Sequence, residues 1–431
     1  MKPPDTTPGP WLNRFAVFTA LATLALLGMG GLVTSHGVGM AVPDWPNTYG
    51  YNMFLFPVSQ WVGGIFYEHS HRLIGAFVGL LTAILAAWLW MRETRGRSRW
   101  LGLGAVILVV VLLGIRKMPV YYTLAAAGVL VMGFGLYQYG REARQLRWLG
   151  VVALAAVVVQ GVLGGLRVVW FKNEIGIFHA TLAQLFFVLI CAIALLTSRW
   201  WRVQASSQGS QTSAGQGWLN PTAGSRLRWL AVGTTLLILL QLMLGATMRH
   251  QHAGLAIPDF PLAYGKLWPA MDAESVMRYN QQRLEVTALN PITSFQIGLQ
   301  MTHRIGAVAI LFCVAWVAWL TRRNAGNALG VMGGSLRRLA QVWLALMLVQ
   351  AGLGAWTIWS NKAADVATAH VLVGALSLVT GALWCIIAFR RLPGTTDAAA
   401  ALSGQARQSL AGDFARSNGG FHGNPATVSN H

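Results

Sequence analysis

Acidic side chains are scarce in this sequence, which has 13 Asp and Glu against 32 Lys and Arg and only 10% charged residues in all. Soluble domains carry about 25% charged residues, so the composition excludes an ordinary soluble domain. The basic residues lie between apolar runs and form no continuous face, which argues against nucleic acid as a partner. Short segments of alternating polarity are also missing, so a membrane β-barrel is not indicated.

Cysteine is rare as well. Cys191, Cys313 and Cys385 all lie inside apolar runs, and none has a partner cysteine in a loop. Neither a disulfide framework nor a zinc site is therefore predicted. A cleavable signal peptide is not indicated, because the first apolar run, at 12–33, is too long for the core of one.

Long apolar runs dominate what is present, since 55% of the residues are hydrophobic. Several runs reach or approach the roughly 20 residues that cross a bilayer as a helix. The sequence predicts an all-α polytopic membrane protein with about ten transmembrane helices. They are expected at 12–33, 68–91, 100–115, 120–138, 147–168, 176–198, 227–248, 302–321, 335–357 and 366–389.

The sequence also repeats itself. Residues 39–46 read GMAVPDWP and residues 254–261 read GLAIPDFP, while residues 160–165 read QGVLGG and residues 350–355 read QAGLGA. We predict two tandem, related four-helix bundles with pseudo-two-fold symmetry. The segment 100–138 is an extra transmembrane hairpin in the first half.

The predicted divisions follow from composition. A cytoplasmic tail at 1–11 precedes the N-terminal bundle at 12–198. A cytoplasmic linker at 199–226, rich in Ser, Gly and Gln, precedes the C-terminal bundle at 227–390, and the tail at 391–431 is expected to be disordered. One set of helix ends carries most of the arginines, which the positive-inside rule assigns to the cytoplasm. We therefore expect a multi-pass protein of the cell inner membrane with both termini cytoplasmic and both long loops outside.

Four histidines share one position in this layout. His71, His179, His303 and His370 each lie near the outer end of an apolar segment, about one turn into the expected helix. An ionisable side chain inside a bilayer is costly and marks a candidate functional site. Because the two histidine-bearing helices of each bundle run in the same direction, they can present two imidazoles to one haem iron. Zinc is disfavoured, since two histidines per bundle are too few ligands.

Glu68 is the carboxylate that stands out, because it lies one helical turn before His71. Its counterpart before His303 is Gln300, which cannot act as a base. A carboxyl group in a dry site suits proton transfer, and this predicts a catalytic role. A helix cap or a partner of the helix dipole is the alternative reading. The difference between Glu68 and Gln300 suggests that one bundle performs chemistry while the other holds a cofactor.

Other polar residues keep two interpretations. Arg72 and Arg304 follow their histidines, and either grip haem propionates or reach outer headgroups. Asp44 and Asp259 either fix their turns through Asx hydrogen bonds or belong to a lid over each haem. The remaining histidines near the loops are expected to be solvated or interfacial. These are His36, His69, His250 and His252.

Together these residues resemble the haem A synthase family. The residues that carry the resemblance are Glu68 with His71 and Arg72, His179, Gln300 with His303 and Arg304, His370, and the two Pro-Asp-aromatic-Pro loops. The resemblance implies oxidation of a methyl group of haem O to a formyl group, giving haem A, in two successive hydroxylations. It also implies that His303 and His370 hold a haem b cofactor, that His71 and His179 lie at the substrate haem, and that Glu68 is needed for activity.

The resemblance sets further expectations. Electrons are expected to pass from the substrate to haem b, and the expected partners are haem O, haem O synthase, an electron acceptor and membrane lipid. Many bacterial members carry a cysteine pair in the first outer loop, where this chain has Ala41 and Val42, and the hairpin at 100–138 is additional to the family's eight helices. The competing reading is a non-catalytic dihaem b-type membrane cytochrome in quinol electron transfer, which would not need the difference between Glu68 and Gln300. A transporter ranks last, because the repeats share one orientation.

Overall fold

The computed structural model describes residues 9–142, 145–206, 221–282, 291–328 and 330–391. Within these residues, ten helices are long and apolar enough to cross a membrane. The prediction of an all-α polytopic membrane protein is confirmed. The long helices are α1 (Pro10–Ser35), α2 (Gly63–Glu93), α3 (Gly96–Leu113), α4 (Met118–Arg141), α5 (Leu146–Trp170), α6 (Asn173–Thr197), α8 (Pro221–His250), α10 (Ser294–Ala328), α11 (Gly330–Trp359) and α12 (Ala364–Arg391).

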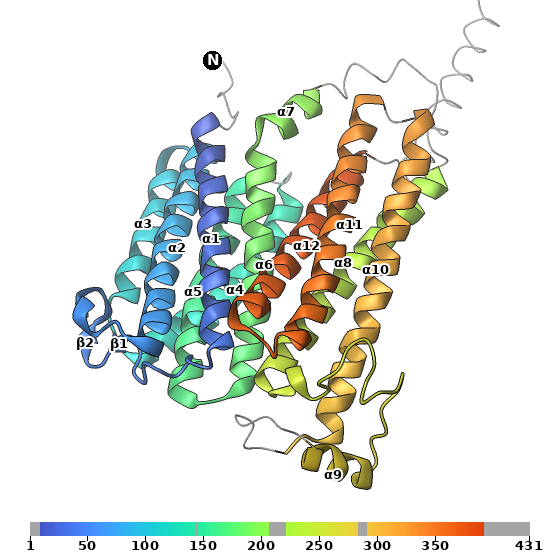
Figure 1. Cartoon of the computed structure of the whole chain (residues 1–431). Coiled ribbons are helices and arrows are strands. Elements are labelled where there is room, and N and C mark those ends of the chain that lie inside the picture. Colours follow the sequence, from blue (N-terminus) through green and yellow to red (C-terminus); the bar gives the residue numbers. More distant parts are fainter. Residues whose placement is uncertain (1–8, 143–144, 207–220, 283–290, 329, 392–431) are drawn as a thin grey trace, which may run out of the picture.

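Helix packing repeats between the two halves of the chain. In the first half, α1 packs on α2, α2 on α5, α5 on α6 and α6 back on α1. In the second half, α8, α10, α11 and α12 pack on one another in the same cyclic order. The two rings lie side by side, as Figure 1 shows, and meet where α1 contacts α12 and α6 contacts both α8 and α12. We call these rings the first unit and the second unit.

The buried cores extend across this boundary. Ala375 and Val379 of α12 belong to the core cluster of the first unit, together with the fully buried Ile190 and Ile193 of α6. In the second unit, the fully buried Trp343 anchors a separate cluster. Because α12 contributes to both clusters, separating the units would expose apolar side chains that are now buried.

The extra hairpin packs outside the first ring. Helix α4 lies against α5, and α3 lies against α2. A Cβ atom at Gly128 or Gly135 of α4 would lie 2.7 Å from a valine side chain of α5, so only glycine permits this close approach. Helix α3 buries none of its residues against the rest of the described chain. The hairpin therefore covers one side of the first unit without entering its ring.

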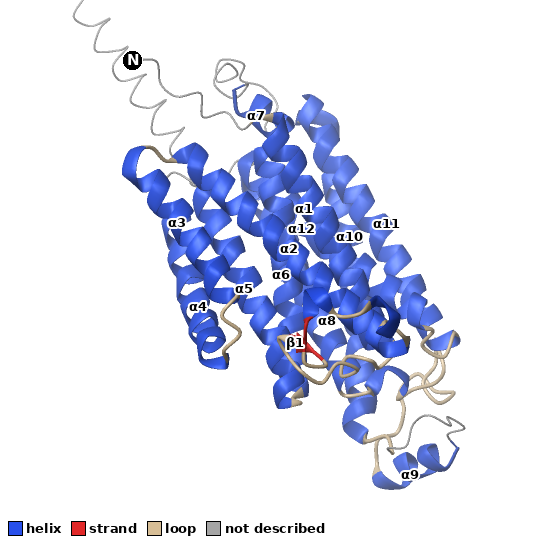
Figure 2. Ribbon diagram, turned by 90° about the vertical axis from the view of Figure 1, so that its left-hand side faces the viewer, coloured by secondary structure: helices blue, strands red, loops and turns tan. Residues whose placement is uncertain are grey.

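The two long connections lie at the same end of the helices, which we call the loop end (Figure 2). The first contains the short strands β1 (Asn47–Thr48) and β2 (Tyr51–Asn52), which pair antiparallel, and the 3-10 turns Met53–Leu55 and Val58–Gln60. The second contains the 3-10 turn Ala253–Leu255 and α9 (Ala273–Gln282), a helix that the sequence analysis did not predict.

The linker differs in part from its prediction. A short helix, α7 (Arg199–Ser206), occupies its start, and α8 already begins at Pro221. The intervening residues 207–220 lie outside the described residues, as do the tail at 392–431 and residues 1–8. The proposed divisions between tails, linker and units otherwise stay predictions.

Candidate functional site: four imidazoles on four glycines

Each of the four predicted haem ligands packs its imidazole against a glycine of the preceding antiparallel helix in its ring. A Cβ atom added to that glycine would lie 3.0 to 3.4 Å from the imidazole Cε1 atom, closer than most real Cβ contacts. The pairs are Gly30 with His71, Gly164 with His179, Gly245 with His303, and Gly354 with His370. The missing side chain thus leaves room for the ring, and all four histidines are half-buried.

A glutamine lies one helical turn before three of these glycines. The Nε2 atom of Gln160 donates to the backbone oxygen of His179 at 2.8 Å, and Nε2 of Gln241 donates to that of His303 at 2.7 Å. Nε2 of Gln350 lies 3.4 Å from Nε2 of His370. In the fourth case, before Gly30, the residue is Leu26. These amides hold the histidine-bearing helices against their neighbours.

The ring nitrogens of His179 are oriented in a way that suits iron. Its Nδ1 atom lies 3.2 Å from the backbone oxygen of Gln160, whereas the buried Nδ1 atoms of His71, His303 and His370 have no hydrogen-bond partner among the described residues. A histidine that ligates a metal usually donates its other ring N–H to a carbonyl or carboxylate. A proton on Nδ1 of His179 leaves Nε2 with its lone pair, so the donor set fits a haem iron.

The structure brings the predicted pairs together. His179 is within electrostatic range of His71, and His303 is within range of His370. Each pair comes from two helices of one ring, α2 with α6 and α10 with α12. The arrangement provides one pair of imidazoles per unit, and both pairs lie toward the loop end.

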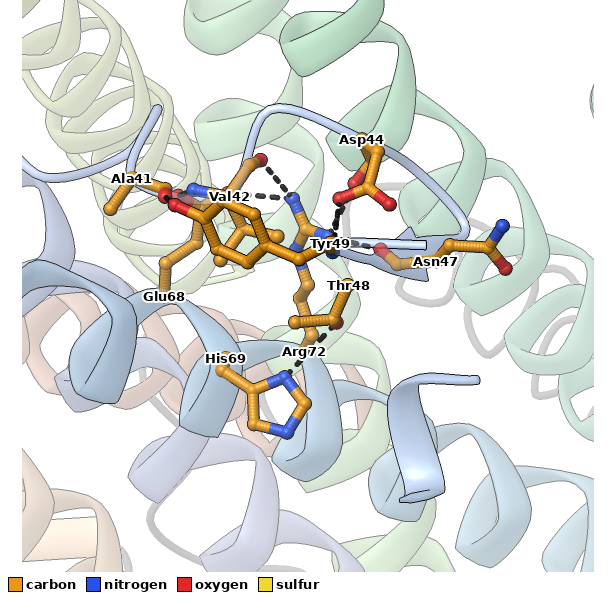
Figure 3. Close-up of polar contacts among 9 residues, drawn as sticks. All are labelled: Ala41, Val42, Asp44, Asn47, Thr48, Tyr49, Glu68, His69 and Arg72. Carbon is orange, nitrogen blue, oxygen red and sulfur yellow. Dashed lines mark hydrogen bonds and ion pairs between the residues drawn. The ribbon is translucent and has the colours of Figure 1, made fainter. Parts of the chain in front are cut away.

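Glu68 is buried, with 3% of its surface exposed, and it anchors the first loop (Figure 3). Its Oε2 atom accepts a hydrogen bond from the Val42 amide at 2.8 Å, and its Oε1 atom accepts one from Arg72 Nη2 at 2.7 Å. The reading of Glu68 as a helix N-terminal cap is wrong, because the first turn of α2 at Gly63 contains no acidic residue. The carboxylate instead ties a membrane helix to the loop above it.

Gln300 anchors the second loop in the same way. Its Oε1 atom accepts from the Ile257 amide at 2.7 Å, and its Nε2 atom donates to the carbonyls of Gly254 and Ile257 at 3.3 Å. Ile257 is the counterpart of Val42 in the repeat. A neutral amide can therefore satisfy the loop amide that Glu68 satisfies in the first unit, and only the first unit adds a charge.

The two arginines that follow the histidines are committed to the loops. Arg72 donates to the carbonyls of Asp44, Asn47 and Val42 at 2.7 to 2.9 Å. Arg304 donates through Nη1 to the Leu262 carbonyl at 2.8 Å and through Nη2 to that of Asp259 at 2.7 Å. Their binding of haem propionates stays a prediction, and these bonds support a role in holding the loops.

The aspartates of the repeated motif hold their turns, but through bonds to amides five and six residues on and not through Asx turns, which reach two residues on. The Asp44 carboxylate accepts from the amides of Tyr49 and Gly50 at 2.8 Å (Figure 3). The Asp259 carboxylate accepts from the amides of Tyr264 and Gly265 at 2.7 and 2.8 Å. Both loops also contain a cis proline after the aromatic residue of the motif. The duplicated motif thus folds into the same turn twice.

Two histidines expected at a solvated interface are buried instead. His69 is fully buried against Phe56 and Trp61, and its Nδ1 atom lies 3.2 Å from the Thr48 hydroxyl. His250 is 8% exposed and lies where a Cβ atom on Gly176 would touch it. The expectation was wrong because the first loop folds back over His69, whereas His250 packs against the neighbouring helix α6 at Gly176.

The sequence analysis missed the role of Gln241. The signal was available, because a glutamine precedes a glycine by four residues in three of the long apolar runs, at 160, 241 and 350. The similarity between the segments at 160 and 350 was recognised, but the one at 241 was not. The contact between Gly30 and His71 had no such signal, since Leu26 replaces the glutamine there.

Comparison with known proteins shows which family the chain belongs to. A family model described as "Cytochrome oxidase assembly protein" matches residues 119–382, more than half of the chain. The chain belongs to this family. It is similar to proteins named "Heme A synthase" from Geobacillus kaustophilus strain HTA426, at 24% identity over 83% of this chain and 86% of the relative, and from Lysinibacillus sphaericus strain C3-41, at 21% identity over 88% of this chain and 94% of the relative. The predicted membership of the haem A synthase family is confirmed.

Proposed function

We propose that this member of the haem A synthase family is itself a haem A synthase. The first unit would oxidise the methyl group of haem O to a formyl group by successive hydroxylations, and the second unit would hold haem b as the electron acceptor. The observation that carries the proposal is the pair of half-buried imidazoles in each unit, with each imidazole packed against a glycine. The names of the relatives support the same reaction.

The residues of each unit would have distinct tasks. His303 and His370 would ligate haem b, which supplies an acceptor for single electrons when bound. His71 and His179 would hold the substrate haem, and the amide of Gln160 would keep the helix of His179 in register. A hydroxylation that takes its oxygen from water removes two electrons and two protons. Glu68 would accept one of these protons at the carboxylate oxygen that now faces Arg72.

The orientation and partners belong to the same proposal. Arginines gather at the ends of the helices opposite the loop end, including Arg92, Arg141 and Arg337, so these ends would face the cytoplasm. The loop end would then lie at the outer surface of the cell inner membrane. Haem O, haem O synthase and an electron acceptor are the proposed partners.

Pigment analysis tests the function directly. The full-length protein is purified from cells that make haem O, and its haems are extracted and identified by mass. Haem b together with haem O and haem A is the expected result. Haem b alone would reject the synthase and favour the dihaem b-type cytochrome. That alternative leaves the carboxylate of Glu68 unexplained, because Gln300 anchors its loop without one.

Histidine variants assign the two units. His303→Ala should remove haem b, whereas His71→Ala should leave haem b bound and abolish haem A. The measurement is the haem content of each purified variant together with its absorption spectrum. Loss of the same haem in both variants would contradict the division of labour between the units.

A further inference from the structure

Two arginines break the internal duplication beside the histidine pairs. The repeat places Thr357 opposite Arg167 of α5, and it places Thr34 opposite Arg249 of α8. In those positions Thr357 and Thr34 bond back to their own helices, to the carbonyls of Leu353 and Gly30 at 2.8 Å. The fold therefore accepts threonine at these places, and the arginines need another explanation.

Arg167 is half-buried under the first loop. A Cβ atom on Gly39 would lie 3.0 Å from both terminal nitrogens of its guanidinium group, so the loop backbone passes directly over it. Arg167 is within electrostatic range of His71 and His179. It donates no hydrogen bond to any described residue, and Glu68, the carboxylate within its electrostatic range, is already bound to Arg72.

Arg249 lies where the units meet. Its Nη2 atom donates to the Gly31 carbonyl of α1 at 3.0 Å and to the Ser35 hydroxyl. It is within electrostatic range of His370 and of Arg167. The ion pairs between described residues involve neither Arg167 nor Arg249. Two cations at the loop end therefore lie within electrostatic range of each other, and neither forms an ion pair with a described carboxylate.

Neighbouring cations in a water-poor site repel each other and lose hydration, which is costly unless an anion binds between them. The porphyrin of the proposed function carries two carboxylates. Its expected ligands, His71 and His179, lie within electrostatic range of Arg167, which is in turn within range of Arg249. We propose that Arg167 and Arg249 form an anion site that binds the propionate groups of the haem held by His71 and His179. This inference rests on the proposed function, and it moves the propionate contact away from Arg72 and Arg304.

The proposed site explains the broken duplication. Arg72 and Arg304 are counterparts in the two units, and each holds the loop of its own unit. An arginine present in both units cannot distinguish one haem from the other. Arg167 and Arg249 lie on opposite sides of the boundary between the units, beside His179 and His370. A bidentate guanidinium grips a carboxylate with two N–H groups, so each arginine can bind one propionate.

The test compares a haem with and without its carboxylates. Ferric protohaem and its dimethyl ester are titrated into the purified full-length protein, and binding is followed by absorption. The wild-type protein should bind the ester roughly tenfold or more weakly, since a hydrogen bond to a charged group is lost. Arg167→Thr and Arg249→Thr, which introduce the residue of the other unit, should each bring the ratio of the two affinities toward one.

Controls separate the outcomes. Arg278→Gln, which changes an exposed arginine of α9, should keep the wild-type ratio. Should a threonine variant fail to purify, Arg167→Lys keeps the charge but loses the fork of donors, and an intermediate ratio is expected. An unchanged ratio in both threonine variants overturns the site, and loss of co-purified phospholipid in those variants would assign the arginines to a lipid phosphate instead.

The failure of the proposed function would look different. If the wild-type protein binds no added haem, or if His71→Ala leaves the titration unchanged, the first pair of histidines is not a haem site. If binding depends on His71 but the ratio ignores Arg167 and Arg249, only the anion site is wrong.

Discussion

Replacing Glu68 by Ala or by Gln separates its loop contact from its proposed chemistry. The carboxylate accepts from the Val42 amide at 2.8 Å and from Arg72 at 2.7 Å. Glutamine can keep the first bond, because Gln300 accepts from the Ile257 amide in the same way at 2.7 Å. Alanine keeps neither bond. Both variants should stop the formation of haem A while haem b stays bound.

The two variants should differ in the stability of the first loop. Removing one partner of a buried ion pair costs about 3–5 kcal/mol. Arg72 retains three carbonyl acceptors, which lowers the expected cost of Glu68→Ala to about 2–3 kcal/mol. Glu68→Gln should cost about 1 kcal/mol, since the amide still accepts the Val42 N–H. At about 1.4 kcal/mol per factor of ten, the alanine variant should speed local opening by roughly 30- to 150-fold.

Hydrogen exchange at Tyr49 and Gly50 measures this opening, because their amides bond to Asp44 inside the loop. The matched control is Gln300→Ala, which should loosen the second loop and leave these two amides protected. Normal haem A in the Glu68→Gln variant would remove the proton-transfer role. Equal exchange in both Glu68 variants would show that the charge, and not the amide contact, holds the loop.

Three further predictions concern Gly164, Gln241 and Asp272. Gly164→Ala should weaken haem binding by roughly tenfold, because the added Cβ atom would lie 3.0 Å from the imidazole of His179. Gly161→Ala is the control, since its Cβ atom would meet nothing within 4 Å, and an absorption titration compares the two variants. Gln241→Leu should lower retention of haem b about fivefold, since a backbone hydrogen bond worth about 1 kcal/mol is lost, as measured by the haem content after purification. The Ser275 amide lowers the pKa of Asp272 at the start of α9, so the Asp272 carboxylate stabilises this helix at pH values above the pKa that Asp272 has in the unfolded chain. Hydrogen exchange in α9 should become faster as the pH falls through the folded-state pKa of Asp272. Asp272→Ala should abolish that pH dependence.

Much of the architecture could be predicted from local pattern. Long apolar runs locate helices because a bilayer demands about 20 apolar residues, and the Pro-Asp-aromatic-Pro motif is enough to predict a turn held by its aspartate. The contact between Gly164 and His179 could not be predicted in this way, since it depends on which face of α5 meets α6. The burial of His250 was missed for the same reason, because its neighbour Gly176 lies on another helix.

Any functional difference between the two units must come from the residues at which their sequences differ. The two units share their imidazoles, their glycines and their loop arginines, so these features alone give both haems the same surroundings. The first unit differs by Leu26 in place of a glutamine, by a charged anchor at Glu68, and by Arg167 in place of a threonine. All three lie on helices of the ring that holds His71 and His179. Leu26 leaves the backbone of His71 without the amide contact that His303 receives from Gln241, and Glu68 and Arg167 add charges that the second unit lacks at the corresponding positions. A substrate that must enter, react and leave needs a different environment from a cofactor that stays. Three of the differences lie in the first unit, and a further one, Arg249 in place of a threonine, lies in the second.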